Sequence, residues 1–414
     1  MIDSSYTLIP NNTEQNNATI KVIGVGGGGC NAVTRLFKKG IKDVELLICN
    51  TDMQALRNSP VPEKLQLGTA LTRGLGAGCD PEKGRNAALE SLEEFKQMIG
   101  KNIEMVFITA GMGGGTGTGA APVIAKTIRE MGLLTVGVIT YPFLDEGREA
   151  LERAYNGMLE FSKYTDSILI VDNQKMYEMY PDKTLEEAYS MADNVLDTAV
   201  RGITNIIVQE GFVNVDMNDL KTVMKNSGMA IASIGNAKGE NRAMEAVESA
   251  FNSPLLNDFD LRTARNLIVN ITCRQNGLTM GEQQQIMEYV HNFTGQDIDK
   301  SKKGIVYDEN MDPDEVSVTI VATGFKFHLT PPTKRTPKRN EEDILVVNSQ
   351  VEDNGNSIIF AAPFQQTDSI RLQEFNPAFT AIYTADSKVI DFETEPALVR
   401  RERLKREFAE KNKE

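Results

Sequence analysis

The chain has 414 residues, 41% of them hydrophobic, and a formal net charge of −14. This length and composition indicate a globular protein of two or three domains. The acidic balance argues against nucleic acid as a bulk partner, because phosphate backbones attract lysine and arginine. The four cysteines are widely spaced and form no CxxC pair, which indicates reduced thiols rather than a disulfide framework or a zinc site.

The polar, Asn-rich start lacks the pattern of a signal peptide, and we expect residues 1–18 to be a disordered tail. No run approaches the ~18 apolar residues of a membrane span. We therefore expect a cytoplasmic protein without a transmembrane segment.

Short apolar segments alternate with helical ones in the first half of the chain. The predicted strands are "TIKVIGVGG", "VELLICNTD", "EMVFITAG" and "LLTVGVITYPF", and the predicted helices are "NAVTRLFKKG", "EKGRNAALESLEEFKQMIG" and "APVIAKTIREMG". The second of these is expected to be one helix that ends at Gly100. This alternation is typical of an α/β fold with a mostly parallel sheet covered on both faces, and we assign residues 19–182 to it.

A long helix follows, and after it the pattern changes. Apolar residues recur at helical spacing through 183–210, with Thr184 as the expected N-cap, so we predict a helix that bridges two domains. Residues 211–325, with "NLIVNITC" and "EVSVTIVATGF", are expected to form an α+β domain. Residues 326–390 lack periodicity and are predicted to be a flexible linker with apolar segments such as "ILVV" and "SIIFAAPF". Residues 391–414 are a candidate charged helix.

Three glycine-rich loops are each expected between a strand and a helix: "GVGGGGC", "RGLGAG" (Arg73–Gly78) and "GGGTGTG". The most distinctive, "GGGTGTG", has glycine at five of its seven positions from Gly113 to Gly119. A loop between a strand and a helix lies where α/β folds bind ligands, and its backbone N–H groups favour anions. Three such loops suit a triphosphate, with hydroxyl donors from Thr116 and Thr118. The alternative is a cluster of tight turns without a ligand.

A second interpretation rests on the first loop alone. Gly24, Gly26 and Gly29 fit the G-x-G-x-x-G fingerprint of dinucleotide-binding proteins, with Asp43 or Glu45 as the acid that contacts ribose. This would indicate an NAD(P)-dependent oxidoreductase, but it leaves "GGGTGTG" unexplained. No GxxxxGK[ST] motif occurs, so the chain is not a P-loop protein.

Together these segments resemble the FtsZ family of tubulin-like division GTPases. The resemblance covers about residues 19–325 and is carried, in order, by "KVIGVGGGGCNAV", "NTDMQAL", "GLGAGCDPEKGR", "ITAGMGGGTGTGAAPVIA", "TYPFLDEG", "GFVNVDMNDLKTVM" and "NSPLLNDFDL". It implies a tubulin-like fold that binds GTP or GDP, with Mg²⁺ held mainly through the phosphates and no metal ligands of the protein's own. It also implies head-to-tail protofilaments at the mid-cell division ring, and a C-terminal tail that binds membrane-tethering division proteins and regulators.

The resemblance also implies roles for particular residues. Asn214, Asp216 and Asp219 would enter the nucleotide site of the next subunit and act on the attacking water; read without the family, an aspartate here is an ordinary helix N-cap. Glu146 would contact ribose, Asn173 and Asp193 would recognise guanine, and Tyr189 would stack on it. The predicted nucleotide contacts are Gly26, Gly27, Gly28, Gly29, Asn31, Asn50, Asp52, Gly76, Gly78, Gly113, Gly114, Gly115, Thr116, Gly117, Thr118, Gly119, Thr140, Glu146, Asn173, Tyr189 and Asp193.

The sequence departs from the family pattern in two places. Ala150 stands where the family usually has an arginine, with Arg148 or Arg153 as possible substitutes, and Asp145 stands where an aromatic residue is common. The tail "EPALVRRERLKREF" resembles the family's end peptide only loosely. Two alternatives are kept. One is a plasmid-partition tubulin relative, against which the tail and the full-length resemblance count; the other is a nucleotide-binding scaffold that assembles without hydrolysis, which the loss of the arginine at Ala150 would permit.

Overall fold

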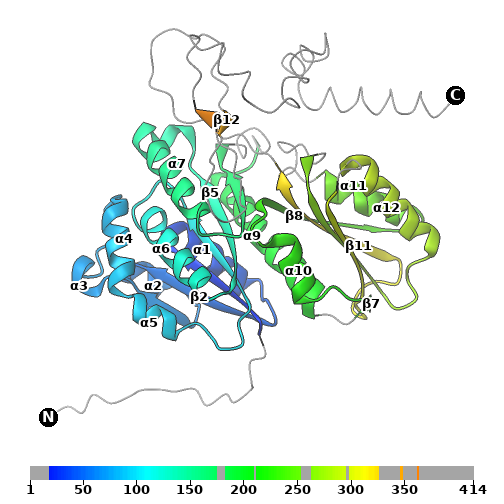
Figure 1. The fold of residues 1–414 in the computed structure, drawn as a ribbon, viewed down its shortest axis with the longest axis horizontal. Helices are drawn as coiled ribbons and strands as arrows, with labels where there is room; N and C mark the ends of the chain where they lie inside the picture. Colours follow the sequence, from blue (N-terminus) through cyan, green and yellow to red (C-terminus); the bar gives the residue numbers. More distant parts are fainter. Residues whose placement is uncertain are drawn as a thin grey trace, which may run out of the picture. The chain divides into compact units, whose positions relative to one another are not determined.

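Six parallel strands form the first half of the sheet, in the order β3-β2-β1-β4-β5-β6 (Figure 1). The computed structural model describes residues 18–174, 182–208, 211–252, 263–294 and 298–325, and two short strands beyond them. The six strands are β1 (Ile20–Val25), β2 (Val44–Asn50), β3 (Glu63–Gln66), β4 (Met105–Gly111), β5 (Leu134–Tyr141) and β6 (Ser167–Asp172). The predicted parallel α/β fold is confirmed.

Helices connect these strands, and two of them begin earlier than predicted, within the glycine loops. The elements are α1 (Gly26–Lys38), α2 (Met53–Asn58), α3 (Thr69–Thr72), α4 (Pro81–Glu90), α5 (Leu92–Gln97), α6 (Thr116–Glu130), η1 (Leu144–Glu146) and α7 (Arg148–Ser162). The prediction of one helix up to Gly100 was wrong, because Ser91 divides it into α4 and α5. The Ser91 hydroxyl accepts a hydrogen bond from Gly68 N (3.0 Å) and donates to Gln66 O (3.3 Å), and these partners hold it outside regular helix geometry.

The predicted long helix is α9 (Leu185–Val208). Its start is a capping box, because Glu187 N–H donates to Thr184 Oγ1 (3.3 Å) while Thr184 N–H donates to Glu187 Oε2 (2.9 Å). Leu196, Val200 and Ile203 on α9 are buried in a core that also contains residues of β1, β4 and β8. Helix α9 contacts α1 of the first half and strands β8 and β11 of the second half.

The second half of the chain continues the same sheet in mixed orientation, in the order β8-β11-β9-β10-β7. Its elements are β7 (Gly211–Val213), α10 (Met217–Met224), β8 (Gly228–Lys238), α11 (Arg242–Phe251), β9 (Asn266–Cys273), α12 (Met280–Thr294), β10 (Lys300–Tyr307) and β11 (Glu315–Phe325). Only two residue pairs, Ser167↔Gly228 and Ile168↔Met229, join β6 to β8. Helices α11 and α12 lie side by side (Figure 1).

The predicted N-terminal tail, apart from Ala18, and nearly all of the predicted linker and tail lie outside the described residues. The exceptions are β12 (Val346–Val347) and β13 (Ala361–Ala362), which pair antiparallel and fall within the two apolar segments singled out in the linker. The domain boundaries stay a prediction. No helix in the described ranges is long and apolar enough to cross a membrane.

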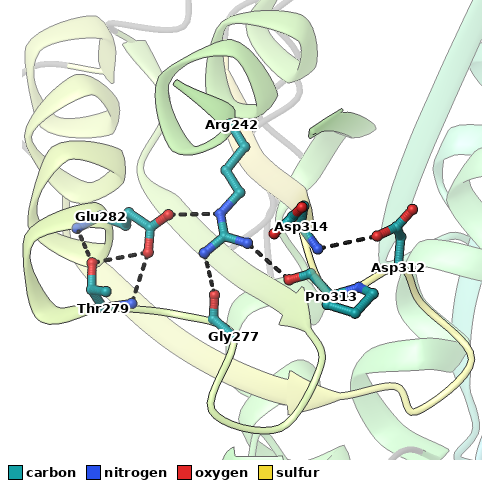
Figure 2. Close-up of polar contacts among 7 residues, drawn as sticks. All are labelled: Arg242, Gly277, Thr279, Glu282, Asp312, Pro313 and Asp314. Carbon is teal, nitrogen blue, oxygen red and sulfur yellow. Dashed lines mark hydrogen bonds and ion pairs between the residues drawn. The ribbon is translucent and has the colours of Figure 1, made fainter. Parts of the chain in front are cut away.

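Arg242 connects three segments of the second half (Figure 2). Its guanidinium donates to Glu282 Oε1 (2.7 Å) on α12, to Gly277 O (2.5 Å) and to Pro313 O (3.0 Å). The other oxygen of Glu282, Oε2, accepts from Thr279 N–H and Oγ1–H, so both oxygens of the carboxylate accept hydrogen bonds. These bonds, made by side chains that are mostly buried, fix the start of α11 against the loops that precede α12 and β11.

Replacing Glu282 by glutamine should destabilise the protein in a pH-dependent manner. The hydrogen bond from Arg242 lowers the pKa of Glu282 below its ordinary 4.5, so its stabilisation is present above pH 4.5 and is lost as the pH falls through the lowered pKa. We expect the variant to lose about 1–2 kcal/mol of unfolding free energy at pH 7. Urea titrations should show this difference shrinking below pH 4.5; a pH-independent difference would contradict the electrostatic explanation.

Candidate nucleotide site

The predicted nucleotide residues lie beyond the carboxyl ends of the parallel strands. Gly26 to Gly29 and Asn31 begin α1 after β1; Asn50 and Asp52 follow β2; Gly113 to Gly119 join β4 to α6; Thr140 lies at the end of β5; and Asn173 follows β6. Backbone contacts tie the third loop to this edge, because Gly76 N–H donates to Thr51 O (3.3 Å) and Met53 N–H donates to Gly74 O (3.2 Å). The structure thus brings the three glycine loops together at one edge of the sheet. Helix N-termini at such an edge present free backbone N–H groups that can bind phosphate.

Most glycines of these loops are required by the protein's own packing. A Cβ atom on Gly26 would lie 2.7 Å from Gly117 N, and one on Gly117 would lie 2.4 Å from Gly111 O. A Cβ on Gly115 would lie 2.8 Å from both Ala77 Cβ and Asp80 N. The expectation that these glycines are needed for contact with a ligand was therefore incomplete, since close contact between the loops already excludes side chains.

Two glycines of the loops are required neither by packing nor by a positive φ angle. Gly27 and Gly114 are exposed, and a Cβ on either would meet no atom within 4 Å. Gly76 and Gly78 likewise meet nothing, but their positive φ angles of 82° and 62° already favour glycine. Open space above Gly27 and Gly114, at the starts of two helices, fits a phosphate chain bound by backbone N–H groups.

Threonine hydroxyls form hydrogen bonds within and between the segments of the site. Thr51 Oγ1 and Thr116 Oγ1 are 2.7 Å apart and buried, and Thr118 Oγ1 accepts from Gly113 N–H at 2.9 Å. These bonds hold the "GGGTGTG" backbone in place. Donation from Thr116 or Thr118 to phosphate stays a prediction. Thr51 was not predicted from the sequence, because only the fold places it beside Thr116.

Cys30 lies in the first turn of α1, where a helix N-terminus ordinarily favours a thiolate. Burial has the larger effect here and raises the pKa of Cys30 to about 12. The thiol instead contacts Gly24 O (3.7 Å) and Cys49 O (3.5 Å) and stays protonated. Cys30 is thus a packing residue of the loop rather than a reactive thiol.

Polar groups of the predicted base and ribose region lie after β5 and β6. Asn173 is buried, its N–H donates to Tyr141 O (3.1 Å), and its Oδ1 has no hydrogen-bond partner among the residues that the structure describes. Glu146 Oε1 accepts from Phe143 N–H (2.9 Å), and the contact of Glu146 with ribose stays a prediction. The side chains of Tyr189 and Asp193 lie outside the described residues. A buried acceptor without a partner is costly, and the N–H groups of a purine base could satisfy it.

Replacing Asn173 by leucine should affect the free and nucleotide-bound protein differently. Removing an unpaired buried acceptor costs the free protein little, so its unfolding temperature should stay within about 2 °C of wild type. The stabilisation by added GTP should fall, because binding energy adds to stability only through the affinity. Thermal unfolding with and without GTP measures both; an unchanged GTP-induced shift would remove Asn173 from the site.

The predicted hydrolytic residues lie at the opposite edge of the sheet. Asp216 caps α10 by accepting from Asp219 N–H (2.7 Å), so the N-cap interpretation holds for its side chain in the isolated subunit. Lys221 of α10 donates to Glu104 Oε2 (2.7 Å), and Glu104 immediately precedes β4. The glycine loop follows the other end of β4, whose seven residues span roughly 20 Å. The structure therefore does not bring Asp216 and Asp219 to the glycine loops of their own subunit.

Family comparison identifies both halves of this arrangement. Residues 19–181 match the GTPase domain of the Tubulin/FtsZ family, and residues 228–326 match the C-terminal domain of the FtsZ family. The cell division protein FtsZ of Pseudomonas aeruginosa is 42% identical over 398 residues, which cover 93% of this chain and 97% of that protein. The chain belongs to the FtsZ family. The Pseudomonas putida FtsZ is 47% identical over 316 residues, 76% of this chain and 78% of that protein.

Solved structures agree with this FtsZ assignment. An empty FtsZ dimer from M. jannaschii has a TM-score of 0.66 at 38% identity and covers 78% of this chain and 95% of its own. CetZ2 of Haloferax volcanii, at 20% identity and a TM-score of 0.62 over 74% of this chain and 93% of its own, shows the shared fold. The predicted tubulin-like architecture is confirmed.

The positions of Asp43 and Glu45 contradict the dinucleotide-binding interpretation, in which one of them would contact ribose. Glu45 lies at the amino end of β2 and binds the buried Lys21 ammonium (3.0 Å), which also contacts Glu63 (2.8 Å). Asp43 precedes β2 altogether. Neither carboxylate lies at the carboxyl edge, where a ribose acid of a dinucleotide site would be.

One of the two candidate substitutes for the missing arginine of the FtsZ pattern contacts the glycine loop. Ala150 is buried, while Arg153 Nε donates to Gly113 O (2.8 Å) in the glycine loop. Arg148 instead pairs with Glu152 (2.7 Å) on α7. Arg153 is thus the cation that reaches the loop. Within the described residues, no three His, Cys, Asp or Glu side chains gather to hold a metal.

Proposed function

We propose that this FtsZ-family chain is a GTPase that assembles head to tail and hydrolyses GTP between subunits. One observation carries the proposal: the glycine loops lie at one edge of the sheet, and the segment Asn214–Asp219, here called the acidic loop, lies at the opposite edge. Each edge carries half of a hydrolytic site, and a second copy, stacked edge to edge, supplies the other half. Because such a contact is heterologous and does not close, repeating it builds a filament.

In this proposal the two edges have distinct chemical tasks. Backbone N–H groups at Gly27 and Gly114 bind the phosphate chain, and Asn173 Oδ1 accepts from the base. Mg²⁺ on the phosphates, when bound, offsets their charge. Asp219 of the adjoining copy orients the attacking water, and the Asn214 side chain, whose Oδ1 accepts from Gly211 N–H (2.7 Å), shapes the same loop.

Sedimentation tests the proposal against its alternatives. With GTP, the protein should pellet above a threshold concentration, release phosphate, and return to the supernatant when GTP is exhausted. With ATP or NADH in place of GTP, it should stay in the supernatant. Pelleting without phosphate release would support a passive scaffold, and hydrolysis by a protein that never pellets would exclude the filament.

We further propose that these filaments form the division ring in the cytoplasm and that the C-terminal tail links them to membrane-tethering proteins. The segment Arg400–Arg406 holds five basic residues and one acid, and Leu398 and Phe408 supply an apolar anchor suited to a partner groove. These residues lie outside the described part of the chain.

Deleting residues 391–414 should therefore leave GTP turnover within about twofold of wild type, because the residues proposed to bind and hydrolyse GTP all lie between Gly26 and Asp219. Ring localisation of a fluorescent fusion should be lost. Normal rings from the truncated protein would contradict the role given to the tail.

A further inference from the structure

A lysine on β10 contacts the acidic loop directly. Lys302 Nζ lies 2.5 Å from Asp219 Oδ1, and their side chains are 44% and 27% exposed. The contact was not predicted from the sequence, where the only sign is the basic run "DKSKKG", which lies at the start of β10 in the structure. It joins β10 to the first turn of α10, at the edge where the hydrolytic carboxylate is presented.

The pairing of β7 with β10 places the acidic loop beside the half of β10 that carries Lys302. β7 pairs antiparallel with β10 at Val213↔Ile305, and the chain then continues into Asn214 and Asp216 beside the amino half of β10. Lys300 lies two residues before Lys302, hence on the same face, and donates to Thr222 O (3.0 Å) of α10. Both lysines thus contact α10, but only Lys302 bonds to a carboxylate of the acidic loop.

The charge of Lys302 has a consequence for the proposed interface. Asp219 raises the pKa of Lys302 through their hydrogen bond, with a smaller contribution from the charge of Asp216, so Lys302 stays cationic at neutral pH. A carboxylate that approaches the phosphates of a neighbouring subunit meets like charge. A lysine bonded to that carboxylate offsets the repulsion and fixes which oxygen faces the water.

We propose that Lys302 is a positioning residue for hydrolysis: by bonding Asp219 Oδ1 it orients that carboxylate and compensates its charge at the phosphate end of the adjoining subunit. This inference rests on the proposed function. It makes the acidic half of the site a set of residues from two elements, α10 and β10, rather than one loop.

The test compares Lys302→Met with Lys300→Met in the full-length protein. Both variants remove one positive charge from the same strand face, but only the first removes a bond to Asp219. We expect Lys302→Met to lower the maximal GTP turnover of fully assembled protein about tenfold, since misplaced catalytic groups cost rate. GTP affinity of the dilute protein and the unfolding temperature should not change, and Lys300→Met should retain wild-type turnover.

Two further variants separate positioning from structural support. Lys302→Arg should recover most of the turnover, because arginine can make the same charge-assisted bond. In an Asp219→Asn background, Lys302→Met should cause no further loss, since the two residues act as a unit. Equal turnover in Lys302→Met and Lys300→Met, or additive losses in the double variant, would overturn the inference; concentration-independent turnover of the wild type would overturn the proposed function with it.

Discussion

Asp219→Ala should still bind GTP and assemble, yet hydrolyse GTP at least about 100-fold more slowly than wild type, the size of effect expected for a group that positions an attacking nucleophile. Its side chain lies at the edge of the sheet away from the subunit's own glycine loops, so its loss leaves the pocket intact. Filaments should consequently persist longer after GTP is added. Phosphate release and light scattering, recorded on the same sample, measure both effects.

Glu245→Ala is the matched control for this variant. Glu245, like Asp219, is an acid in the first turn of a helix of the second half, but it lies on α11 rather than α10 and is exposed, whereas Asp219 is half-buried. Its replacement should leave turnover and filament lifetime unchanged. If Asp219→Ala loses GTP binding in dilute solution, the residue belongs to the local pocket and the assignment is wrong.

The neighbouring glycines Gly114 and Gly115 should respond in opposite ways to substitution. Gly114→Leu places a side chain in the open space above the loop, so GTP affinity should fall tenfold or more while the unfolding free energy stays within about 0.5 kcal/mol of wild type. Gly115→Ala forces a methyl group against Ala77 and Asp80 and should cost about 1–3 kcal/mol of stability through overpacking.

Urea unfolding and nucleotide titration of both variants separate these two effects. Loss of stability in Gly114→Leu, with affinity retained, would show that the open space at Gly114 is not where phosphate binds. An undisturbed Gly115→Ala variant would show that the loops can move apart, and the packing explanation of the glycines would then fail.

Strands and helices of this fold could be predicted because they depend on local patterns. Buried parallel strands appear as unbroken apolar runs, and the Thr184–Glu187 capping box appears in the sequence at its required spacing. The break at Ser91 could not be predicted, because it depends on Gln66 at the end of β3 and on Gly68 in the loop that follows. Local propensity alone favoured one continuous helix there.

The candidate site was predictable in its motifs but not in its internal contacts. Glycine spacing indicated phosphate loops, yet only the structure separates Gly27 and Gly114, which face open space, from Gly115 and Gly117, which face other backbone segments. The bond between Lys302 and Asp219 likewise joins segments far apart in the chain. Such contacts depend on strand pairing, which the order of residues along the chain does not reveal.

GTP turnover per subunit, measured across a range of protein concentrations, tests the shared site most directly. The account predicts negligible turnover in dilute solution, a threshold, and then a rise to a plateau as interfaces form, because each site needs Asp219 from a second copy. The threshold should coincide with the concentration at which the protein begins to pellet. A specific activity that stays constant down to concentrations at which only monomers are present would contradict hydrolysis between subunits.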